Sequence, residues 1–236
     1  MFALPVTFCA VVLIPVILAG AAEAEPEVSP AKTAAEAGLV DIIELVPDII
    51  ADIRYAGSHN FIGQRIDGYH APRCYLLQPA AHALQRVAQE LRGQALRLKI
   101  FDCYRPARAV RHFVEWAADP QDQLGKAEFY PRVDKSDLLG VYIAPVSGHS
   151  RGATIDLTLA RCQGQCRELE MGTPYDYFDE LAHTDAPDID AEHRRNRDLL
   201  RSAMQRQGFS NYELEWWHYT LSPQPSPDVV YDVPVR

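Results

Sequence analysis

The sequence is short of positive charge and of cysteine, and it contains no internal repeat or long low-complexity run. Lys and Arg together number 23 against 32 Asp and Glu, which gives a formal net charge of −9 at pH 7. An acidic surface repels polyanions, so nucleic acids and anionic lipid surfaces are not expected partners. The one dense basic run, at residues 194–197, lies in a helical pattern with Glu192 and Asp198 and does not change that expectation. The lack of repeats excludes a solenoid or propeller.

Residues 2–22 lack charged side chains altogether and are dominated by Val, Leu, Ile, Ala and Phe. The Ala22-Glu23-Ala24 sequence that follows is an Ala-x-Ala cleavage pattern, so residues 1–24 are predicted to be a secretory signal peptide. No Lys or Arg precedes the apolar run, however, and about 20 apolar residues are also long enough to cross a bilayer as an uncleaved anchor. We therefore expect an exported, periplasmic protein, or one anchored in the membrane and facing the periplasm.

Only five cysteines are present, and one of them lies within the predicted leader. The other four are Cys74, Cys103, Cys162 and Cys166. An even number in an exported protein favours disulfides, and four cysteines allow three pairings. The short spacing favours Cys162 with Cys166, which leaves Cys74 for Cys103, although a Cys-x3-Cys pair can also bind a structural metal. Cys103 stands two residues before Arg105, where a disulfide would brace the loop that carries this arginine.

Removal of the leader leaves about 210 residues, which fits one domain with a sizeable core. The Ala-, Glu- and Pro-rich residues 25–38 are predicted to form a flexible lead-in, and residues 39–236 the folded domain. Hydrophobic periodicity and Pro or Gly punctuation predict helices over residues 79–92, 106–118 and 190–207, and strands over residues 96–102, 153–159 and 212–221. This order favours a single α+β domain with a mainly antiparallel sheet and flanking helices. The long connection 119–146 is interpreted as a functional lid.

Two segments carry the parts of a hydrolytic zinc site. One runs Ser-Gly-His-Ser-Arg-Gly-Ala-Thr-Ile-Asp from residue 147 to Asp156, and the other is Glu-Trp-Trp-His from Glu215 to His218. Catalytic zinc typically takes three protein ligands and leaves a fourth position to water, whose pKa falls to about 7. His149, Asp156 and His218 are the candidate ligands of one zinc ion, and Glu215 is left to move protons. Either segment alone would be read as a structural histidine with a nearby acid.

The local patterns constrain how these residues can meet. The strand expected at residues 153–159 places Asp156 on its polar face, and His149 lies just before it in a Gly-bounded turn. Residues three apart on a regular strand face opposite sides, so Glu215 and His218 need a bulge or a strand end between them. Glu215 is preferred to the neighbouring Glu213 as proton carrier because it keeps the three-residue offset to His218.

Together these residues resemble the zinc signature of the D-Ala-D-Ala peptidases, the family of VanX-type dipeptidases and VanY-type carboxypeptidases. Further segments, spread over about residues 40–236, resemble the dipeptidase branch in the same order. They are Asp52-Ile-Arg-Tyr-Ala, Asn60-Phe-Ile-Gly, Asp102-Cys-Tyr-Arg-Pro, Met171-Gly-Thr-Pro-Tyr-Asp-Tyr-Phe-Asp-Glu and Glu215-Trp-Trp-His. One departure is Ala153-Thr154, where the family often has a small residue followed by Ala. The resemblance implies the α+β, hedgehog-like fold of this family, with the zinc site at the sheet.

The resemblance also implies a function, which is hydrolysis of the D-Ala-D-Ala dipeptide to free D-alanine by zinc-activated water. Glu215 would act as general base and then general acid. Arg105, which matches the arginine of the family's Tyr-Arg-Pro segment, would stabilise the oxyanion, because a guanidinium stays charged and donates in a rigid fork. Its alternative interpretation is a structural salt bridge. Ser147 would hydrogen-bond the substrate, or alternatively cap the local turn.

A dipeptidase must also recognise a free amino terminus, and the resemblance assigns that role to Asp176 and Tyr55. Either could instead be an ordinary surface residue. A pocket that pairs the substrate ammonium with Asp176 would reject N-blocked peptides, because the carboxylate would be left unsatisfied. This feature would separate a dipeptidase from a carboxypeptidase.

Two other functions stay open at this point. A peptidoglycan D,D- or L,D-carboxypeptidase would need an open groove in place of the amine pocket. A non-catalytic zinc-binding or wall-binding module would have no need of Glu215 or Arg105. The remaining histidines lack ligand spacing to the two segments and are interpreted as surface or supporting residues, and Trp216 and Trp217 as core or pocket wall. These histidines are His59, His70, His82, His112, His183 and His193.

Overall fold

The computed structural model describes residues 26–236, so the expected signal peptide at residues 1–24 lies outside the described residues. Within that range the fold is built on a six-stranded sheet, beside two small two-stranded sheets. The strands of the main sheet are β3 (Ile50–Ala51), β5 (Leu96–Asp102), β6 (Thr154–Gln163), β7 (Gln165–Glu168), β8 (Phe209–Asn211) and β9 (His218–Leu221). No helix formed by residues 26–236 combines the length and the apolar character needed to cross a membrane.

The main sheet is mostly antiparallel. Its strands are ordered β3-β5-β6-β9-β8, with β7 folded back on β6, and the β3–β5 pair alone is parallel. This is the α+β architecture expected from the order of elements, and β5 has the bounds predicted from alternation. The central strand β6 differs from the expectation of a half-buried strand, because residues 154–160 are buried on both faces. Layers of chain cover both sides of the sheet, so Thr154 and Thr158 are enclosed as fully as their apolar neighbours.

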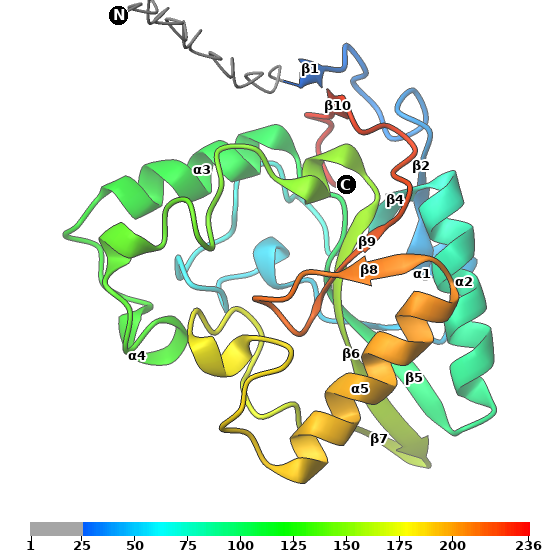
Figure 1. Cartoon of the computed structure of the whole chain (residues 1–236). Coiled ribbons are helices and arrows are strands. Elements are labelled where there is room, and N and C mark those ends of the chain that lie inside the picture. The colour runs from blue at the N-terminus through cyan, green and yellow to red at the C-terminus, as the bar shows by residue number, and fades with distance from the viewer. Residues whose placement is uncertain (1–25) are drawn as a thin grey trace, which may run out of the picture.

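Five α-helices flank the sheet in the described part of the chain. They are α1 (Ile42–Leu45), α2 (Gln78–Arg92), α3 (Ala107–Ala118), α4 (Lys126–Phe129) and α5 (Ala191–Arg206). The three long helices lie where hydrophobic periodicity predicts them, and Pro occupies the first turn of α2 and the N-cap of α3, as helix-start chemistry favours. Figure 1 shows α2 and α5 side by side on one face of the sheet, with α3 and α4 on the other side.

The N-terminal residues of the described chain are mostly exposed but pair with distant segments, while the flexibility expected for residues 25–38 stays a prediction. The strand β1 (Glu27–Val28) pairs in parallel with β10 (Val229–Val230), near the C-terminus. Ala37 is buried, and β2 (Leu39–Asp41) then pairs antiparallel with β4 (Tyr75–Leu77). Composition alone suggested disorder here because the partner strands of this segment come from distant parts of the sequence.

Residues 212–221 form a turn and a strand, and not the single strand predicted from their aromatic residues. The turn joins β8 to β9, and the two strands form an antiparallel hairpin. The amide of Asn211 donates hydrogen bonds to the backbone carbonyls of Glu215 and His218, both at 3.0 Å, and so holds the turn closed. His218 is the first residue of β9. The strand boundary that Glu215 and His218 require is therefore present.

The connection 119–146 is folded against α3. Its buried Lys135 donates hydrogen bonds to the backbone carbonyls of Asp119 and Asp122, both at 2.7 Å, and lies 3.9 Å from the centre of the Trp116 ring. Four apolar side chains of the connection are buried as well, namely Phe129, Tyr130, Leu138 and Ile143. These contacts fix the segment against α3, while its movement as a lid stays a prediction.

Two disulfides close the chain in the pairing favoured by cysteine spacing. Cys74 is joined to Cys103, and Cys162 is joined to Cys166 across the β6–β7 hairpin. Both sulfurs of Cys162 and Cys166 are thereby used, so the alternative of a structural metal at this pair does not apply. The two disulfides differ in burial, since Cys74 and Cys103 lie in the core and Cys166 is exposed.

Candidate active site

Three neighbouring strands place acidic and imidazole side chains in one row. Asp156 of β6 lies opposite Asp102 of β5 on one side and opposite His218 of β9 on the other. Residues that are directly opposite in an antiparallel pair project to the same face of the sheet. The register of the sheet therefore brings together two residues that are 62 positions apart in the sequence, Asp156 and His218.

The third member, His149, is delivered by the tight turn that precedes β6. The turn Gly148–Arg151 has Ser147 as its N-cap, whose Oγ accepts a hydrogen bond from the His149 backbone N–H at 3.2 Å. Gly152 ends the turn with a φ of 73°, a left-handed conformation that favours glycine. The His149 ring lies 2.6 Å through its Nδ1 from the backbone carbonyl of Cys103, to which it donates. In the neutral ring the lone pair of Nε2 then faces Asp156 and His218 on the sheet.

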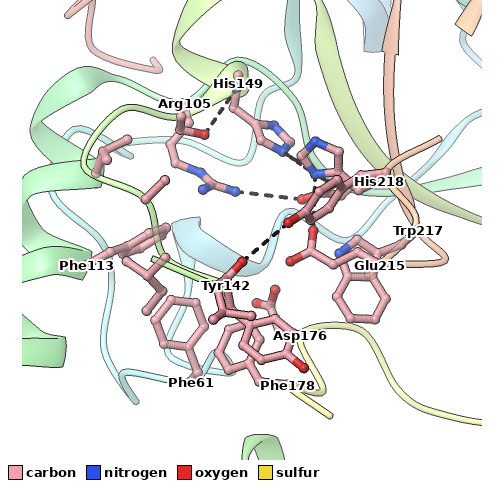
Figure 2. Close-up of a pocket in the computed structure, with 18 of the residues that line it drawn as sticks. Phe61, Arg105, Phe113, Tyr142, His149, Asp176, Phe178, Glu215, Trp217 and His218 are labelled. Atoms are coloured by element: carbon pink, nitrogen blue, oxygen red, sulfur yellow. Dashed lines mark hydrogen bonds and ion pairs between the residues drawn. The ribbon is translucent and has the colours of Figure 1, made fainter. Parts of the chain in front are cut away.

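The three candidate ligands form a compact triangle, of which Figure 2 labels His149 and His218. Asp156 Oδ1 is 3.2 Å from His149 Nε2 and 3.1 Å from His218 Nδ1, and the two ring nitrogens are 3.3 Å apart. Ligands about 2.0–2.1 Å from a tetrahedral zinc ion are separated by about 3.3 Å. Two nitrogens and one carboxylate oxygen at this spacing fit a zinc ion. Among residues 26–236 this is the one group of three or more His, Cys, Asp or Glu side chains placed to share a metal.

The electrostatics of the triangle favour the charged forms of Asp156 and His218. Burial alone would raise the pKa of Asp156, but the adjacent imidazoles outweigh it and hold that pKa well below its usual range. Burial likewise opposes the charged form of His218, but hydrogen bonds and attraction to Asp156 and Glu215 raise its pKa to about 10. Without another cation, a proton therefore stays on His218 beside the Asp156 carboxylate. A divalent ion would replace that proton.

Glu215 lies beside the triangle with one face toward the pocket. Its Oε2 is 3.3 Å from His218 Nδ1, and its residue is 8% exposed. It is held in the β8–β9 turn, where its backbone N–H donates to Tyr212 O at 3.1 Å. Glu215 lines the pocket, whereas the neighbouring Glu213 is not among the lining residues. The carboxylate is thus close enough to exchange a proton with a group at the triangle.

Arg105 points into the same pocket and is braced from behind. Its Nε donates to Asp102 Oδ2 at 3.0 Å, and its Nη2 is 3.7 Å from Asp156 Oδ2. The guanidinium also lies against the rings of Tyr55 and Phe113, at 5.1 and 4.9 Å from their centres. The salt bridge considered as its alternative role is present, and it fixes the guanidinium in the pocket.

The residues expected to bind an amino terminus meet at a second corner of the pocket. The Tyr55 hydroxyl contacts both carboxylate oxygens of Asp176, at 3.2 and 3.0 Å. Both residues are buried, at 1% and 4% exposure, so the alternative of ordinary surface residues is wrong. Burial and the nearby charge of Asp156 raise the pKa of Asp176 well above its usual range, and no salt bridge to it is formed within residues 26–236. Asp176 also has a φ of 59°, an uncommon backbone conformation for a residue other than glycine.

Two further side chains connect the corners and were not singled out from the sequence. The Tyr175 hydroxyl lies 3.0 Å from both Asp156 Oδ2 and the Tyr55 hydroxyl. Asp102, fully buried, accepts from the Tyr69 hydroxyl at 2.6 Å as well as from Arg105. Both residues stand within segments quoted for the family resemblance, but nothing in their local pattern indicated these contacts.

Residues of the 119–146 connection and of the hairpin turn form part of the pocket wall. Val141, Tyr142 and Val146 line it from the connection, and the Tyr212 hydroxyl donates to the backbone carbonyl of Val141 at 3.4 Å. Ser147 lines the inner wall while it caps its turn. The remaining walls are largely aromatic and comprise Phe61, Phe113, Phe178 and Trp217 (Figure 2).

Comparison with known proteins agrees with this geometry. A family model described as D-ala-D-ala dipeptidase matches residues 35–236. A D-alanyl-D-alanine dipeptidase of Enterococcus faecium is 38% identical over 203 residues, which cover 85% of this chain and 100% of the relative. Relatives with the same description from Streptomyces coelicolor and Escherichia coli are 41% and 32% identical; they cover 81% and 82% of this chain and 95% and 90% of their own lengths. The chain therefore belongs to the D-Ala-D-Ala dipeptidase family of peptidases.

Proposed function

We propose that this protein is a zinc dipeptidase that hydrolyses D-Ala-D-Ala to two molecules of free D-alanine. The observation that carries the proposal is the buried Asp176 carboxylate, which shares a pocket with the His149, Asp156 and His218 triangle and has no cationic side chain paired with it in the described structure. A buried carboxylate is costly unless a cation accompanies it. The ammonium group of a short peptide supplies that cation, and the peptide bond beside it then lies toward the triangle.

The triangle would hold one zinc ion per chain. Two imidazole nitrogens and one carboxylate oxygen are a common ligand type for catalytic zinc, and their spacing of 3.1 to 3.3 Å fits its tetrahedral geometry. When bound, the ion supplies Lewis acidity toward the substrate carbonyl and lowers the pKa of water. Asp156 contributes one negative charge, so the site keeps a net positive charge for that purpose.

The side chains around the triangle supply the remaining steps. Glu215 accepts the proton of the attacking water and later donates it to the leaving amine. Arg105 stabilises the negative charge that develops on the carbonyl oxygen, and Asp102 holds its guanidinium in place. Asp176 and Tyr55 bind the ammonium group. Ser147 accepts from a backbone N–H, so its own hydroxyl hydrogen is free to donate to the substrate.

The fit of the amine corner separates this proposal from a peptidoglycan carboxypeptidase. An acylated stem peptide has an amide where the dipeptide has an ammonium group, and it would leave Asp176 buried without a counter-charge. A purely zinc-binding or wall-binding module is disfavoured by the presence of Glu215 and Arg105 in the pocket, because neither is needed to hold a metal or a polymer.

Purified protein tests the proposal directly. Metal content per chain and release of D-alanine from D-Ala-D-Ala should be measured beside L-Ala-L-Ala and N-acetyl-D-Ala-D-Ala. We expect one zinc per chain, turnover of the free D,D-dipeptide, and far slower turnover of the other two compounds. Rapid cleavage of the N-acetylated compound would favour the carboxypeptidase, and zinc binding without cleavage of any peptide would favour the binding module.

We also propose that the protein acts outside the cytoplasm, in the periplasm or anchored to the membrane and facing it. The two disulfides support this location, because such bonds persist in oxidising compartments. An exported enzyme would act on dipeptides released from the cell wall and so recover D-alanine, and it would have little access to a cytoplasmic precursor pool. Activity measured in separated periplasmic and cytoplasmic fractions tests this. A cytoplasmic enzyme would instead suit a role in vancomycin-type resistance.

A further inference from the structure

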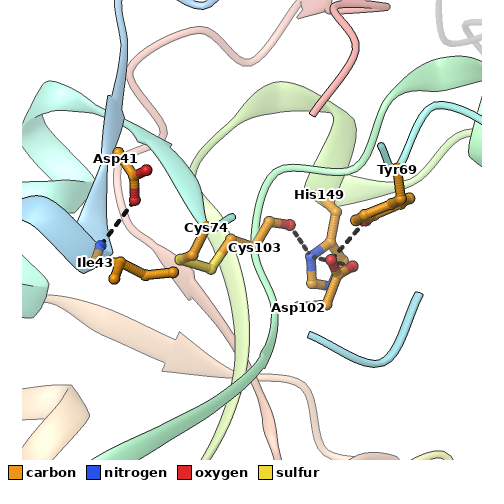
Figure 3. Close-up of a disulfide and its surroundings, with 7 residues drawn as sticks. All are labelled: Asp41, Ile43, Tyr69, Cys74, Asp102, Cys103 and His149. Atoms are coloured by element: carbon orange, nitrogen blue, oxygen red, sulfur yellow. Dashed lines mark hydrogen bonds and ion pairs between the residues drawn. A yellow bond between two sulfur atoms is a disulfide. The ribbon is translucent and has the colours of Figure 1, made fainter. Parts of the chain in front are cut away.

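We propose that the Cys74–Cys103 disulfide helps to position the metal corner, the part of the pocket formed by His149, Asp156 and His218. It does so by fixing the backbone carbonyl that orients the His149 ring. The inference rests on the proposed zinc site and assigns a second role to a bond that otherwise only stabilises the fold. Figure 3 shows the sequence of contacts, from the disulfide through the carbonyl of Cys103 to the imidazole.

The Cys103 carbonyl is the closest acceptor of the His149 ring. The Nδ1 to O distance is 2.6 Å, whereas the nearest carboxylate oxygen of Asp102 is 3.6 Å away. That carboxylate is already engaged by the Tyr69 hydroxyl and by Arg105. The carbonyl of Cys103 therefore selects the ring form that donates from Nδ1 and directs the Nε2 lone pair toward Asp156.

Sheet pairing does not hold this carbonyl in place. β5 ends at Asp102, whose pairing with Asp156 is the last rung of the β5–β6 ladder. Beyond it, the backbone N–H of Tyr104 donates to Tyr75 O at 2.9 Å. The backbone N–H of Arg105 also donates, at 3.3 Å, to the carbonyl of His149. These two hydrogen bonds hold the residues after Cys103, whereas the disulfide is the cross-link on Cys103 itself and the one nearest to its carbonyl.

The other half of the disulfide is anchored in a rigid part of the molecule. Cys74 is fully buried, and its carbonyl accepts from the Ile42 backbone N–H at 2.8 Å. Ile42 begins α1, whose N-cap Asp41 accepts from the Ile43 N–H at 2.9 Å (Figure 3). Cys103 is 2% exposed, so the bond is packed and does not swing. The disulfide and the hydrogen bond from His149 to the Cys103 carbonyl thus connect Cys74, beside α1 and β4, to the His149 ring.

The second disulfide provides a matched control within the same chain. Cys162 and Cys166 lie opposite each other at the far end of β6, where the β6–β7 hairpin is exposed. Neither lines the pocket. Loss of either disulfide removes one covalent link, and the Cys162–Cys166 variant reports any effect of losing a disulfide that does not pass through His149.

The experiment compares C74A/C103A with C162A/C166A and with Leu91→Ala, a substitution in the buried face of α2 that lowers stability away from the pocket. Zinc affinity is measured by chelator competition well below each melting temperature, and the absorption spectrum of the Co²⁺-loaded protein reports ligand geometry. We expect C74A/C103A to bind zinc up to about 10 times more weakly, because the carbonyl stays but is held less firmly, whereas outright loss of an orienting partner costs about 10- to 100-fold, and we expect an altered Co²⁺ spectrum. The two controls should keep the parent affinity and spectrum, and Leu91→Ala should still lower the melting temperature.

A C74V/C103A variant, which refills part of the lost volume, serves if C74A/C103A does not fold. A folded variant of either kind with the parent zinc affinity and Co²⁺ spectrum would overturn the inference and leave the disulfide a stabilising link alone. Equal losses in C74A/C103A and Leu91→Ala would overturn it too. Failure of the proposed function is distinguishable, because the unaltered protein would then bind no zinc or cleave no dipeptide.

Discussion

Asp156 and Asp176 are two buried aspartates in one pocket whose pKa values shift in opposite directions. Both are less than 5% exposed, so burial alone would raise the pKa of each. Asp156 lies within 3.2 Å of two imidazole nitrogens, and their charge lowers its pKa. Asp176 receives the hydroxyl of Tyr55 but no ion pair in the described part of the chain, and the negative charge of Asp156 raises its pKa further. Burial raises the pKa of both carboxylates, and their neighbours decide whether that effect is outweighed, as at Asp156, or reinforced, as at Asp176.

The opposite pKa shifts of Asp156 and Asp176 suit the two corners of the pocket to different ligands. At the metal corner, Asp156 is a charged carboxylate beside two imidazole nitrogens. This ligand set suits a divalent ion that stays in the protein. The Asp176 corner has a carboxylate that becomes fully charged only when a cation arrives, which suits a substrate ammonium that comes and goes. Tyr175 joins the corners through hydrogen bonds to Asp156 and Tyr55. Under the proposed function, the peptide bond of a bound dipeptide would lie between the two corners.

The largest expected effect comes from breaking the metal corner. Asp156→Asn keeps the shape of the side chain but removes the negative ligand, so we expect zinc affinity to fall by more than about 100-fold, beyond the loss seen when only a supporting partner is removed. Activity should be lost with the metal. Isothermal titration with zinc measures this, with Asp176→Asn as the matched control. Parent-like zinc binding by Asp156→Asn would contradict the ligand assignment.

Glu215→Gln should separate metal binding from chemistry. The amide cannot accept a proton from water, so we expect kcat to fall by about 10²- to 10⁴-fold, the usual contribution of a general base. Zinc content should be unchanged, because Glu215 is not a member of the triangle. Glu213→Gln, two residues away and outside the pocket lining, is the control. Retained turnover in Glu215→Gln would remove the proton-transfer role.

Asp176→Asn tests the amine corner. A hydrogen bond to a charged group contributes about 1.5 to 3 kcal/mol, so kcat/KM for D-Ala-D-Ala should fall by about 10- to 150-fold, with zinc still bound. Slow cleavage of N-acetyl-D-Ala-D-Ala, which has no ammonium group, should not fall with it. Tyr55→Phe, which removes only the hydroxyl partner, should show a smaller loss. If kcat/KM falls equally for both substrates in Asp176→Asn, the aspartate does not recognise the substrate ammonium group.

The smallest expected effect is on stability against pH in the metal-free protein. The unfolded chain loses the Asp176 proton near the ordinary pKa of about 3.9, whereas burial makes the folded protein hold it to higher pH. Stability therefore falls as pH rises between the two pKa values, because a buried carboxylate must then charge. Asp176→Asn removes this loss, so its melting temperature should exceed that of the parent more at pH 8 than at pH 4. Thermal melts across this range measure the difference, and a gap that narrows with rising pH would contradict the burial argument.

Much of the site was predictable from sequence because it depends on residue types at short spacing. Imidazoles and carboxylates at His149, Asp156, Glu215 and His218 define what the site can bind wherever the chain places them, and the helices follow from hydrophobic periodicity within one segment. The need for a strand boundary before His218 was also a local geometric argument, and β9 begins at that residue. The cysteine pairing followed from spacing in the same way.

The tertiary structure alone decided what surrounds those groups. The link from Tyr175 to Tyr55, the hydroxyl of Tyr55 on Asp176 and the carbonyl of Cys103 on His149 all arise between residues far apart in the chain. The pairing of β1 with β10 and the two-sided burial of β6 escaped prediction because both depend on distant parts of the chain. Residue identity is a local property, whereas burial, counter-charge and orientation depend on long-range packing that no single segment encodes.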